Sequence, residues 1–267
     1  MHRFLSPSRS SLMCVLFAFA PAGVLAAIAP KEVHQVVPLD AKGELSLETF
    51  KGIVKATAWD RAEVKLDASI QADESSSDCG SEEERAEWVR KTEVKIEAAS
   101  GSVRVRSDYD QLETATNLNN HCISRPFVNY EIKMPVNARL RITDHKSTIQ
   151  VADVHGAITL VTHKSKVDLR GIEGPLELTT HKGEVRVAFS KWAQPSQITT
   201  HKGDVEVSLP KSSRFDLEAV VGRGGELQSD FAGANLVAKG VYQGPVNGGG
   251  PSLRLTTHKG HFRLRQA

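Results

Sequence analysis

The sequence predicts an all-β protein, a single-stranded-repeat β-solenoid or β-roll in which short strands stack on one another. The first observation is a tripeptide of His, Lys and then Ser or Gly, which occurs five times. Its histidines are His145, His163, His181, His201 and His258. The first four lie 18, 18 and 20 residues apart, and the fifth follows after 57. A repeat of about 18–20 residues is typical of architectures in which each repeat forms one coil.

The second observation is the alternation of apolar and polar residues on both sides of the tripeptides. Ile158 and Leu160 precede His163, Val167 and Leu169 follow it, and the other copies keep nearly the same spacing. Apolar residues at every second position indicate strands with one buried face, joined here by a short polar turn. One such unit cannot bury its own apolar face, so successive coils must cover one another.

Residues 1–26 have the features of a secretory signal peptide. Arg3 and Arg9 precede an apolar run over residues 12–20, and the segment ends in small residues, so we expect cleavage after Ala26. A membrane anchor is the alternative, but the apolar run is shorter than the ~20 residues that cross a bilayer. The sequence therefore predicts an exported protein, in the periplasm or at the outer cell surface, with no transmembrane segment after cleavage.

Residues 27–267 are expected to form a single β-solenoid domain with two parts. Residues 139–267 contain the regular repeats. Residues 27–138 alternate less regularly and contain two polar excursions, at 71–92 and 107–125. Glycines that fall near the ends of alternating segments mark the expected turns in both parts.

Each polar excursion contains one of the two cysteines that remain after signal cleavage, Cys79 and Cys122. A lone pair of cysteines in an exported protein is usually a disulfide, which here would close a loop of about 43 residues. We therefore expect the disulfide to tie the two excursions together at one end of the sheets. Metal-binding thiols are the alternative, but no CxxC spacing supports them. The first excursion also predicts a short helix over residues 82–90.

The charge balance of the exported chain argues against a nucleic-acid partner. Removal of the signal peptide leaves 32 basic and 32 acidic residues, so the net charge is close to zero. The part from residue 139 onward is mildly basic, and the part before it is mildly acidic. No aromatic residues are interleaved with the basic ones to stack on bases.

The repeated tripeptide is the candidate functional site. Equivalent residues of stacked coils lie about 4.8 Å apart, so the five histidines are expected to form a column beside a column of lysines. The lysines are Lys146, Lys164, Lys182, Lys202 and Lys259. The simplest interpretation is turn chemistry, because glycine permits a positive φ and the packed ladder stabilises the turns.

Two functional interpretations of these columns remain open. In the first, adjacent imidazoles share a Zn²⁺ or Cu²⁺ ion, with Asp144 and His261 as the nearby additional ligands; no other cofactor is indicated. In the second, the lysines form an anion-binding strip that meets phosphate or acidic glycans on a cell surface. Protonation of the stacked imidazoles below about pH 6.5 would make the column responsive to pH.

An enzyme active site is the interpretation with the least support in the sequence. Parallel β-helices carry polysaccharide lyases and hydrolases, which need convergent carboxylates or a base beside a nucleophile. Asp144, Asp153, Asp168 and Asp204 occupy different points of the repeat, so no acidic cluster recurs. The chain also has no Gly-rich phosphate loop and no H-E-x-x-H pattern. We therefore predict no catalytic residues.

Several segments outside the tripeptides resemble a known family. They are the Gly-Glu-Leu-Ser-Leu segment at 43–47, the segment 59–66, the strand at 130–135 and the later Thr-x-x-Gly-x-Val turns. Together with the signal peptide they resemble the bacterial putative-adhesin family, a domain of unknown function built as a β-solenoid. That family usually carries Asn-Gly or Asp-Gly at the repeat turn, where this chain has His-Lys. The resemblance covers essentially the whole exported chain and implies a cell-envelope location and adhesion, with no catalytic residues to carry over.

The predicted function is therefore that of an exported, non-enzymatic cell-envelope protein that acts as a structural, interaction or adhesion module. Its partner would be an unidentified envelope or surface component. Self-association through an open terminal coil, with an apolar edge at Leu264, is a further expected mode of interaction. A metal-binding or pH-responsive module is the first alternative function, and a carbohydrate-active β-helix enzyme is the second.

Overall fold

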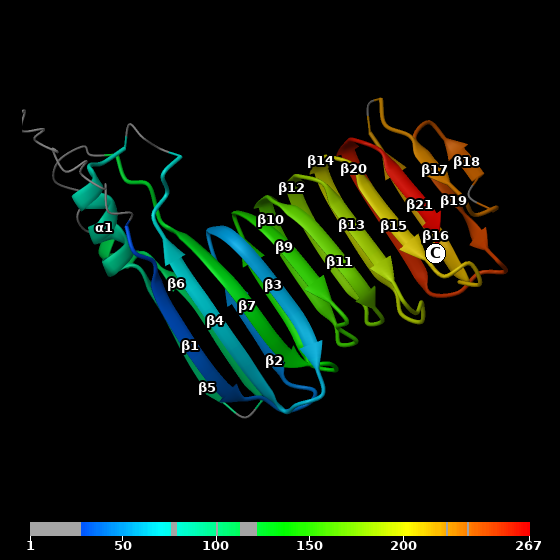
Figure 1. Ribbon diagram of the computed structural model, residues 1–267. Coiled ribbons are helices and arrows are strands. Elements are labelled where there is room, and N and C mark those ends of the chain that lie inside the picture. The colour runs from blue at the N-terminus through cyan, green and yellow to red at the C-terminus, as the bar shows by residue number, and fades with distance from the viewer. Residues whose placement is uncertain (1–27, 76–78, 100, 113–121, 223, 234) are drawn as a thin grey trace, which may run out of the picture.

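The computed structural model describes residues 28–75, 79–99, 101–112, 122–222, 224–233 and 235–267. The chain forms two large β-sheets whose inner faces enclose one hydrophobic core (Figure 1). The sheet of ten strands is called sheet A, and the sheet of eleven strands is called sheet B. The prediction of an all-β fold of stacked short strands is confirmed. The expected signal peptide lies outside the described residues.

Hydrogen-bonded neighbours define the order of the strands in each sheet. Sheet A consists, in spatial order, of β1 (Lys31–Pro38), β4 (Glu63–Gln71), β7 (Phe127–Pro135), β3 (Lys51–Trp59), β9 (Lys146–Ala152), β11 (Lys166–Ile172), β13 (Val185–Phe189), β15 (Val205–Leu209), β21 (Phe262–Gln266) and β17 (Leu227–Ser229). Sheet B consists of β18 (Asn235–Ala238), β19 (Val241–Val246), β16 (Phe215–Val221), β20 (Ser252–Lys259), β14 (Ser196–Lys202), β12 (Leu176–Lys182), β10 (Ile158–Lys164), β8 (Arg139–Asp144), β2 (Glu44–Glu48), β6 (Ser102–Asp108) and β5 (Glu93–Ala99).

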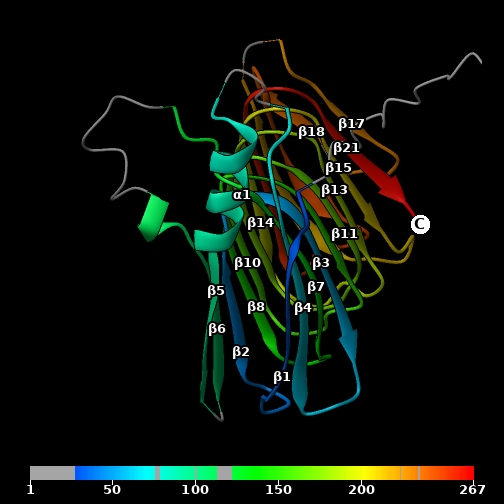
Figure 2. The same ribbon diagram turned by 60° about the vertical axis from the view of Figure 1, so that its left-hand side comes forward.

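Each repeat supplies one strand to sheet B and, after the His-Lys turn, one strand to sheet A. Parallel pairing places Leu160 of β10 opposite Leu178 of β12, and Val167 of β11 opposite Val185 of β13. All four side chains are at most 1 % exposed. Alternate residues point inward, so every repeat adds one layer to the core and leaves its polar residues outside. Figures 1 and 2 show the resulting stack of strands from two sides.

The last repeat does not follow the order of the chain. β20 lies between β14 and β16, and β21 lies between β15 and β17. The chain skips one position after β15, reverses through the antiparallel strands β18 and β19, and returns to fill the gap. The expected apolar edge at Leu264 is therefore wrong. Leu264 has a paired strand on each side and is 0 % exposed.

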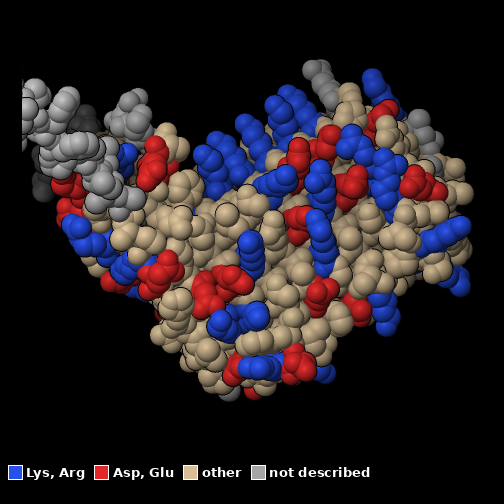
Figure 3. All heavy atoms as spheres, in the orientation of Figure 1, with Lys and Arg blue, Asp and Glu red and all other residues tan. Residues whose placement is uncertain are grey.

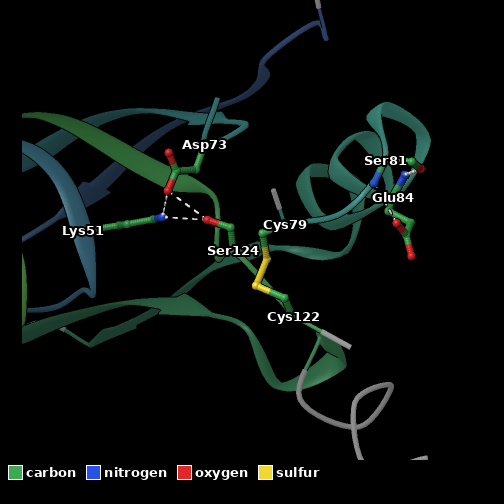
Figure 4. The surroundings of a disulfide bond; sticks show 7 residues. All are labelled: Lys51, Asp73, Cys79, Ser81, Glu84, Cys122 and Ser124. Atoms are coloured by element: carbon green, nitrogen blue, oxygen red, sulfur yellow. Dashed lines mark hydrogen bonds and ion pairs between the residues drawn. A yellow bond between two sulfur atoms is a disulfide. The ribbon is translucent and has the colours of Figure 1, made fainter. Parts of the chain in front are cut away.

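The two polar excursions meet at the N-terminal end of the stack, beside the helix (Figure 4). The predicted helix is present as α1 (Glu82–Lys91), and Ser81 and Glu84 cap it by bonding each other's backbone N–H. Cys79 and Cys122 form the predicted disulfide, with their Cα atoms 5.3 Å apart. No helix among the described residues is long and apolar enough to cross a membrane.

Candidate functional site

Five imidazole rings stack face to face along the edge where the repeats turn. From His145 to His258, successive ring centroids lie 4.7–4.9 Å apart and the ring planes are 3–11° from parallel. Phe50 continues the stack at 4.7 Å from His145. The guanidinium of Arg125 lies 4.3 Å from the centroid of Phe50 and closes this end with a cation–π contact. We call the five histidines the imidazole column.

Phe50 belongs to a sixth copy of the turn, which a pattern beginning with histidine does not find. Lys51 pairs in register with Lys146, and Gly52 with Ser147, so Phe50-Lys51-Gly52 occupies the place of a tripeptide. The signal available in the sequence was a threonine followed by x-Lys-Gly, which three of the later turns share. The stack thus accepts a phenyl ring in place of an imidazole.

Glycine holds the backbone of three of the five His-Lys turns in the left-handed region. Gly183, Gly203 and Gly260 have φ angles of 143°, 139° and 142°. A Cβ atom on Gly203 would lie 1.9 Å from the carbonyl oxygen of Gly183 in the neighbouring coil. These turns therefore require glycine both for the positive φ and for the close approach of two backbones.

Serine replaces glycine in the first two His-Lys turns, and a buried carboxylate stabilises these turns instead. Asp144 accepts hydrogen bonds from Ser147 Oγ at 2.6 Å, from Ser147 N–H at 3.0 Å and from Thr162 Oγ1 at 3.1 Å. Ser165 Oγ also donates to Asp144. All four residues are buried. The oxygens of Asp144 are thus occupied inside the turn.

The lysines of the five tripeptides form a second column beside the imidazoles. Strand register places Lys164 opposite Lys182, Lys182 opposite Lys202, and Lys202 opposite Lys259, and Lys146 precedes them. All five are exposed, and none forms an ion pair or a side-chain hydrogen bond with another described residue. Figure 3 shows basic side chains in a row along this edge. We call these residues the lysine column.

Three imidazoles resist protonation because of their place in the stack. Partial burial lowers the pKa of His163, His181 and His201 below the usual 6.5, and the charges of neighbouring imidazoles and lysines lower it further. Nδ1 of His163 is buried and has no hydrogen-bond partner in the described part of the chain. These three rings therefore favour the neutral form near pH 7.

Mild acid should destabilise the fold through these three histidines. Their pKa is lower in the folded than in the unfolded chain, so their contribution to stability is complete above about pH 6.5 and is lost as the pH falls from there towards the folded values. We expect a constant melting temperature from about pH 8 to 7 and a decrease from about pH 6.5 to 5, measured by scanning calorimetry. His163→Gln/His181→Gln should reduce this decrease. An unchanged decrease in that variant would assign it to other groups.

The parallel rings set a condition on metal binding. A Zn²⁺ ion bound at about 2.0–2.1 Å lies close to the plane of the imidazole that binds it. The rings of His163 and His181 are 4.8 Å apart and only 7° from parallel, so their planes do not meet between them. No group of three or more His, Cys, Asp or Glu residues in the described ranges is arranged to hold a metal ion. A shared Zn²⁺ or Cu²⁺ ion therefore remains a proposal that requires a ring to rotate out of the stack.

An open hollow of about 530 Å³ lies on the outer face of sheet B beside the imidazole column. Thr179, Thr199 and Thr256 are among its lining residues. Each threonine stands two residues before a histidine and so shares its face of the sheet. The lining contains no carboxylate. Hydroxyl, imidazole and ammonium groups therefore run in parallel rows, which suits an extended ligand better than acid–base chemistry.

Comparison with known protein families shows which family the chain belongs to. The family described as Toastrack, DUF4097, matches residues 28–234. The chain belongs to the Toastrack family. This confirms the predicted resemblance to an adhesin-like domain of unknown function. The match ends before β18, so His258 and Lys259, which complete the two columns, lie beyond it. No curated protein matches the chain.

Solved structures resemble this Toastrack protein at low sequence identity. A putative cell adhesion protein from Clostridium sporogenes has a TM-score of 0.55 at 14 % identity, over 89 % of this chain and 100 % of that one. A putative adhesin from Bacteroides fragilis has a TM-score of 0.28 at 7 % identity, over 89 % and 97 %. A putative lipid binding protein from Parabacteroides distasonis has a TM-score of 0.24 at 10 % identity, over 90 % and 97 %. The first of these shows a shared fold.

Proposed function

We propose that this Toastrack protein is an exported, non-enzymatic module of adhesion type that contacts an envelope or surface component through the edge carrying the two columns. The observation that carries the proposal is the row of five exposed lysines without ionic partners in the described structure. Paired strands hold these charges at a fixed spacing along the stack. The edge thus offers a long, regular contact surface, unlike the concave sites that enclose small molecules.

The disulfide supports an exported location. Bonds such as Cys79–Cys122 persist in secreted and periplasmic proteins, whereas cytosolic thiols are kept reduced. The signal-like sequence of residues 1–26 points in the same direction. The structural neighbour from Clostridium sporogenes is described as a putative cell adhesion protein, which fits a place in the periplasm or at the outer surface.

The hollows on sheet B support a non-enzymatic role. The one beside the imidazole column has no carboxylate in its lining. A second, of about 420 Å³, has a single one, Glu177. Enzymes that cleave polysaccharides need two convergent acidic groups or a base beside a nucleophile. Asp144, next in sequence to the column, is occupied by hydrogen bonds within its turn.

Expression of the full chain in a bacterial host tests the export. We expect the protein in the extracytoplasmic fraction, with an N-terminus at Ala27 and no free thiol, as read by N-terminal sequencing and thiol labelling. Retention of the uncleaved chain in the cytoplasm, with its three cysteines as reactive thiols, would contradict the proposal.

Sedimentation with isolated bacterial envelopes tests the interaction role. We expect the exported protein to bind envelopes saturably and to be released by raised salt, since exposed charges are screened. Lys164→Gln/Lys182→Gln should weaken this binding. The matched control Lys191→Gln/Lys211→Gln removes two exposed lysines from the loops at the opposite ends of the strands. Absence of envelope binding, or equal loss in both variants, would contradict the assignment to this edge.

A further inference from the structure

We propose that the two columns form a binding site for a linear acidic polysaccharide, which lies along the edge and is bound more tightly in mild acid. The inference rests on the proposed function and adds the chemical class of the partner and the condition that strengthens binding. Three features carry it: the uncompensated charge of the lysine column, the hydroxyl row beside the imidazoles and the position of both columns on one edge.

The lysine column has a charge pattern that the fold itself does not balance. Like charges directly opposite each other on neighbouring strands are destabilising. Here the repulsion recurs along the stack, from Lys164 to Lys259, with no carboxylate of the described residues within ion-pair distance. Some basic residues outside the column are paired: Lys65 lies 2.9 Å from Asp67, and Arg254 lies 3.2 Å from Glu218. A bound polyanion would supply the charge that the column lacks.

Protection of a sheet edge does not explain these lysines. Proteins place lysines on edge strands to prevent unwanted pairing with another chain. The column follows strands that have hydrogen-bonded neighbours on both sides, such as β10, β12 and β14. The lysines therefore protect no open strand, and their regular exposure is available for binding.

The neighbouring groups favour a carbohydrate over a nucleic acid. Thr179, Thr199 and Thr256 form a row in strand register beside the imidazoles, and their hydroxyls can donate to and accept from sugar hydroxyls. Single-stranded nucleic acids instead need aromatic faces on which bases stack. The large apolar side chains exposed in the described structure are four valines and Ile53, and the imidazole faces are covered by one another. One positive charge per strand layer suits a chain with a carboxylate on successive sugars.

The groups around the imidazole column leave it free to respond to a bound anion. The carboxylates on the strands and turns around it include Glu48, Asp144, Glu177, Glu184, Asp204, Glu218 and Glu226. Asp144 is bonded within its turn, Asp204 is bonded to His261 N–H and Arg263, and Glu218 is paired with Arg254. Besides the lysine column, the cations on these elements include Arg125, Lys166, Arg254 and Arg263. The charges that act on His163, His181 and His201 are all positive.

A polyanion reverses the electrostatic balance of the column. In the free protein, neighbouring positive charges oppose protonation of the imidazoles. A carboxylate chain laid along the lysines neutralises these charges and favours imidazolium, because an opposite charge within about 4–6 Å stabilises the charged form. Binding then takes up protons, so by linkage the affinity increases as the pH falls.

Titration calorimetry with polygalacturonate is the test. The protein obtained after export is titrated at constant ionic strength at two pH values, about 7.5 and about 5.5. These values lie on either side of the usual imidazole pKa. Uronate carboxylates, with pKa values of about 4 or below like other carboxylates, keep their charge at both values. We expect binding that is about tenfold tighter at the lower pH, with proton uptake seen as a dependence of the heat on the buffer.

Matched variants separate the two columns. Lys164→Gln/Lys182→Gln should weaken binding about tenfold, whereas Lys191→Gln/Lys211→Gln, which removes the same charge from the opposite edge, should change it less than about twofold. His163→Gln/His181→Gln should remove the tightening in acid, since the imidazoles that take up protons are replaced by glutamines, which also form ladders on stacked strands. Circular dichroism confirms that each variant is folded.

Four outcomes would overturn the inference. They are equal weakening by both lysine variants, no tightening in acid, equal binding of neutral dextran, and single-stranded DNA binding through the same lysines more tightly than polygalacturonate. The parallel envelope assay separates this inference from the proposed function. Envelope binding without polygalacturonate binding overturns only the polysaccharide assignment. Polygalacturonate binding without envelope binding keeps the site and overturns the adhesive role.

Discussion

Lys51→Ala should lower the free energy of unfolding by about 3–5 kcal/mol, because it leaves the carboxylate of Asp73 buried without its cation. The side chains of Lys51 and Asp73 are 9 % and 6 % exposed, and Lys51 Nζ donates a hydrogen bond to Asp73 Oδ2 (Figure 4). Ser124 Oγ donates to the same oxygen at 2.8 Å. The ammonium also lies 4.6 Å from the centroid of Phe127. The pair is therefore removed from water on several sides.

The pKa of Asp73 gives the same ion pair a signature in acid. Burial acts to raise this pKa, but hydrogen bonds from Lys51, Ser75 and Ser124 outweigh it and hold the pKa well below its usual range. The stability that the pair contributes is thus complete above the unfolded pKa of about 3.9 and is lost as the pH falls through and below that value. This window lies below that of the histidines, so the two losses are separable.

Urea unfolding followed by circular dichroism measures the effect. Lys65→Ala is the control, because Lys65 pairs with Asp67 at the surface and is 46 % exposed; it should cost at most about 1 kcal/mol. Lys51→Met/Asp73→Leu removes both charges and should be much closer to wild type than Lys51→Ala. A loss of less than about 1 kcal/mol in Lys51→Ala would show that the pair is not buried in solution.

Gly203→Ala should lower the free energy of unfolding by about 3 kcal/mol or more. The φ of 139° is strained for any residue with a Cβ, and that atom would lie 1.9 Å from a backbone oxygen of Gly183. The strand pairing of the next coil prevents the backbone from moving away. Ser147 and Ser165 tolerate a side chain at equivalent positions because their φ angles are not positive.

The control for this substitution is Gly101→Ala in the turn between β5 and β6. Nothing lies within 4 Å of a Cβ built on Gly101, and its φ is outside the left-handed region. That variant should stay within about 0.5 kcal/mol of wild type in the same urea titration. Equal stability of the two variants would mean that the turn at Gly203 rearranges without cost.

Local patterns were sufficient for most of the architecture. Alternation around the tripeptides predicted paired strands with one buried face, and residues such as Leu160 and Val167 lie in the core. The acidic run before Arg90 predicted α1, because helix caps and first-turn charges are local signals. The pairing of Cys79 with Cys122 followed from their number and the expected compartment.

Long-range pairing explains what the sequence did not predict. The position of β20 between β14 and β16 depends on which strand edge is free after the chain has skipped a layer. The alternation of apolar residues is the same whether β20 lies before or after β16 in the sheet, so it does not predict the order. The burial of Leu264 follows from that order. Phe50 and Lys51 were missed for a related reason: only the pairing of β3 with β9 shows that they occupy the tripeptide position.

The sequence by itself determined that a histidine and a lysine recur at each turn of a stacked β-fold. The tertiary structure decided what those residues become. Strand pairing at nearly constant spacing holds the imidazoles parallel, so that a shared metal ion requires ring rotation. The same pairing turns Lys51 inward to Asp73 and leaves five lysines exposed. The contacts between charges and the stacking of the rings depend on the distances between neighbouring coils. Those distances are set only when the coils stack in the folded protein.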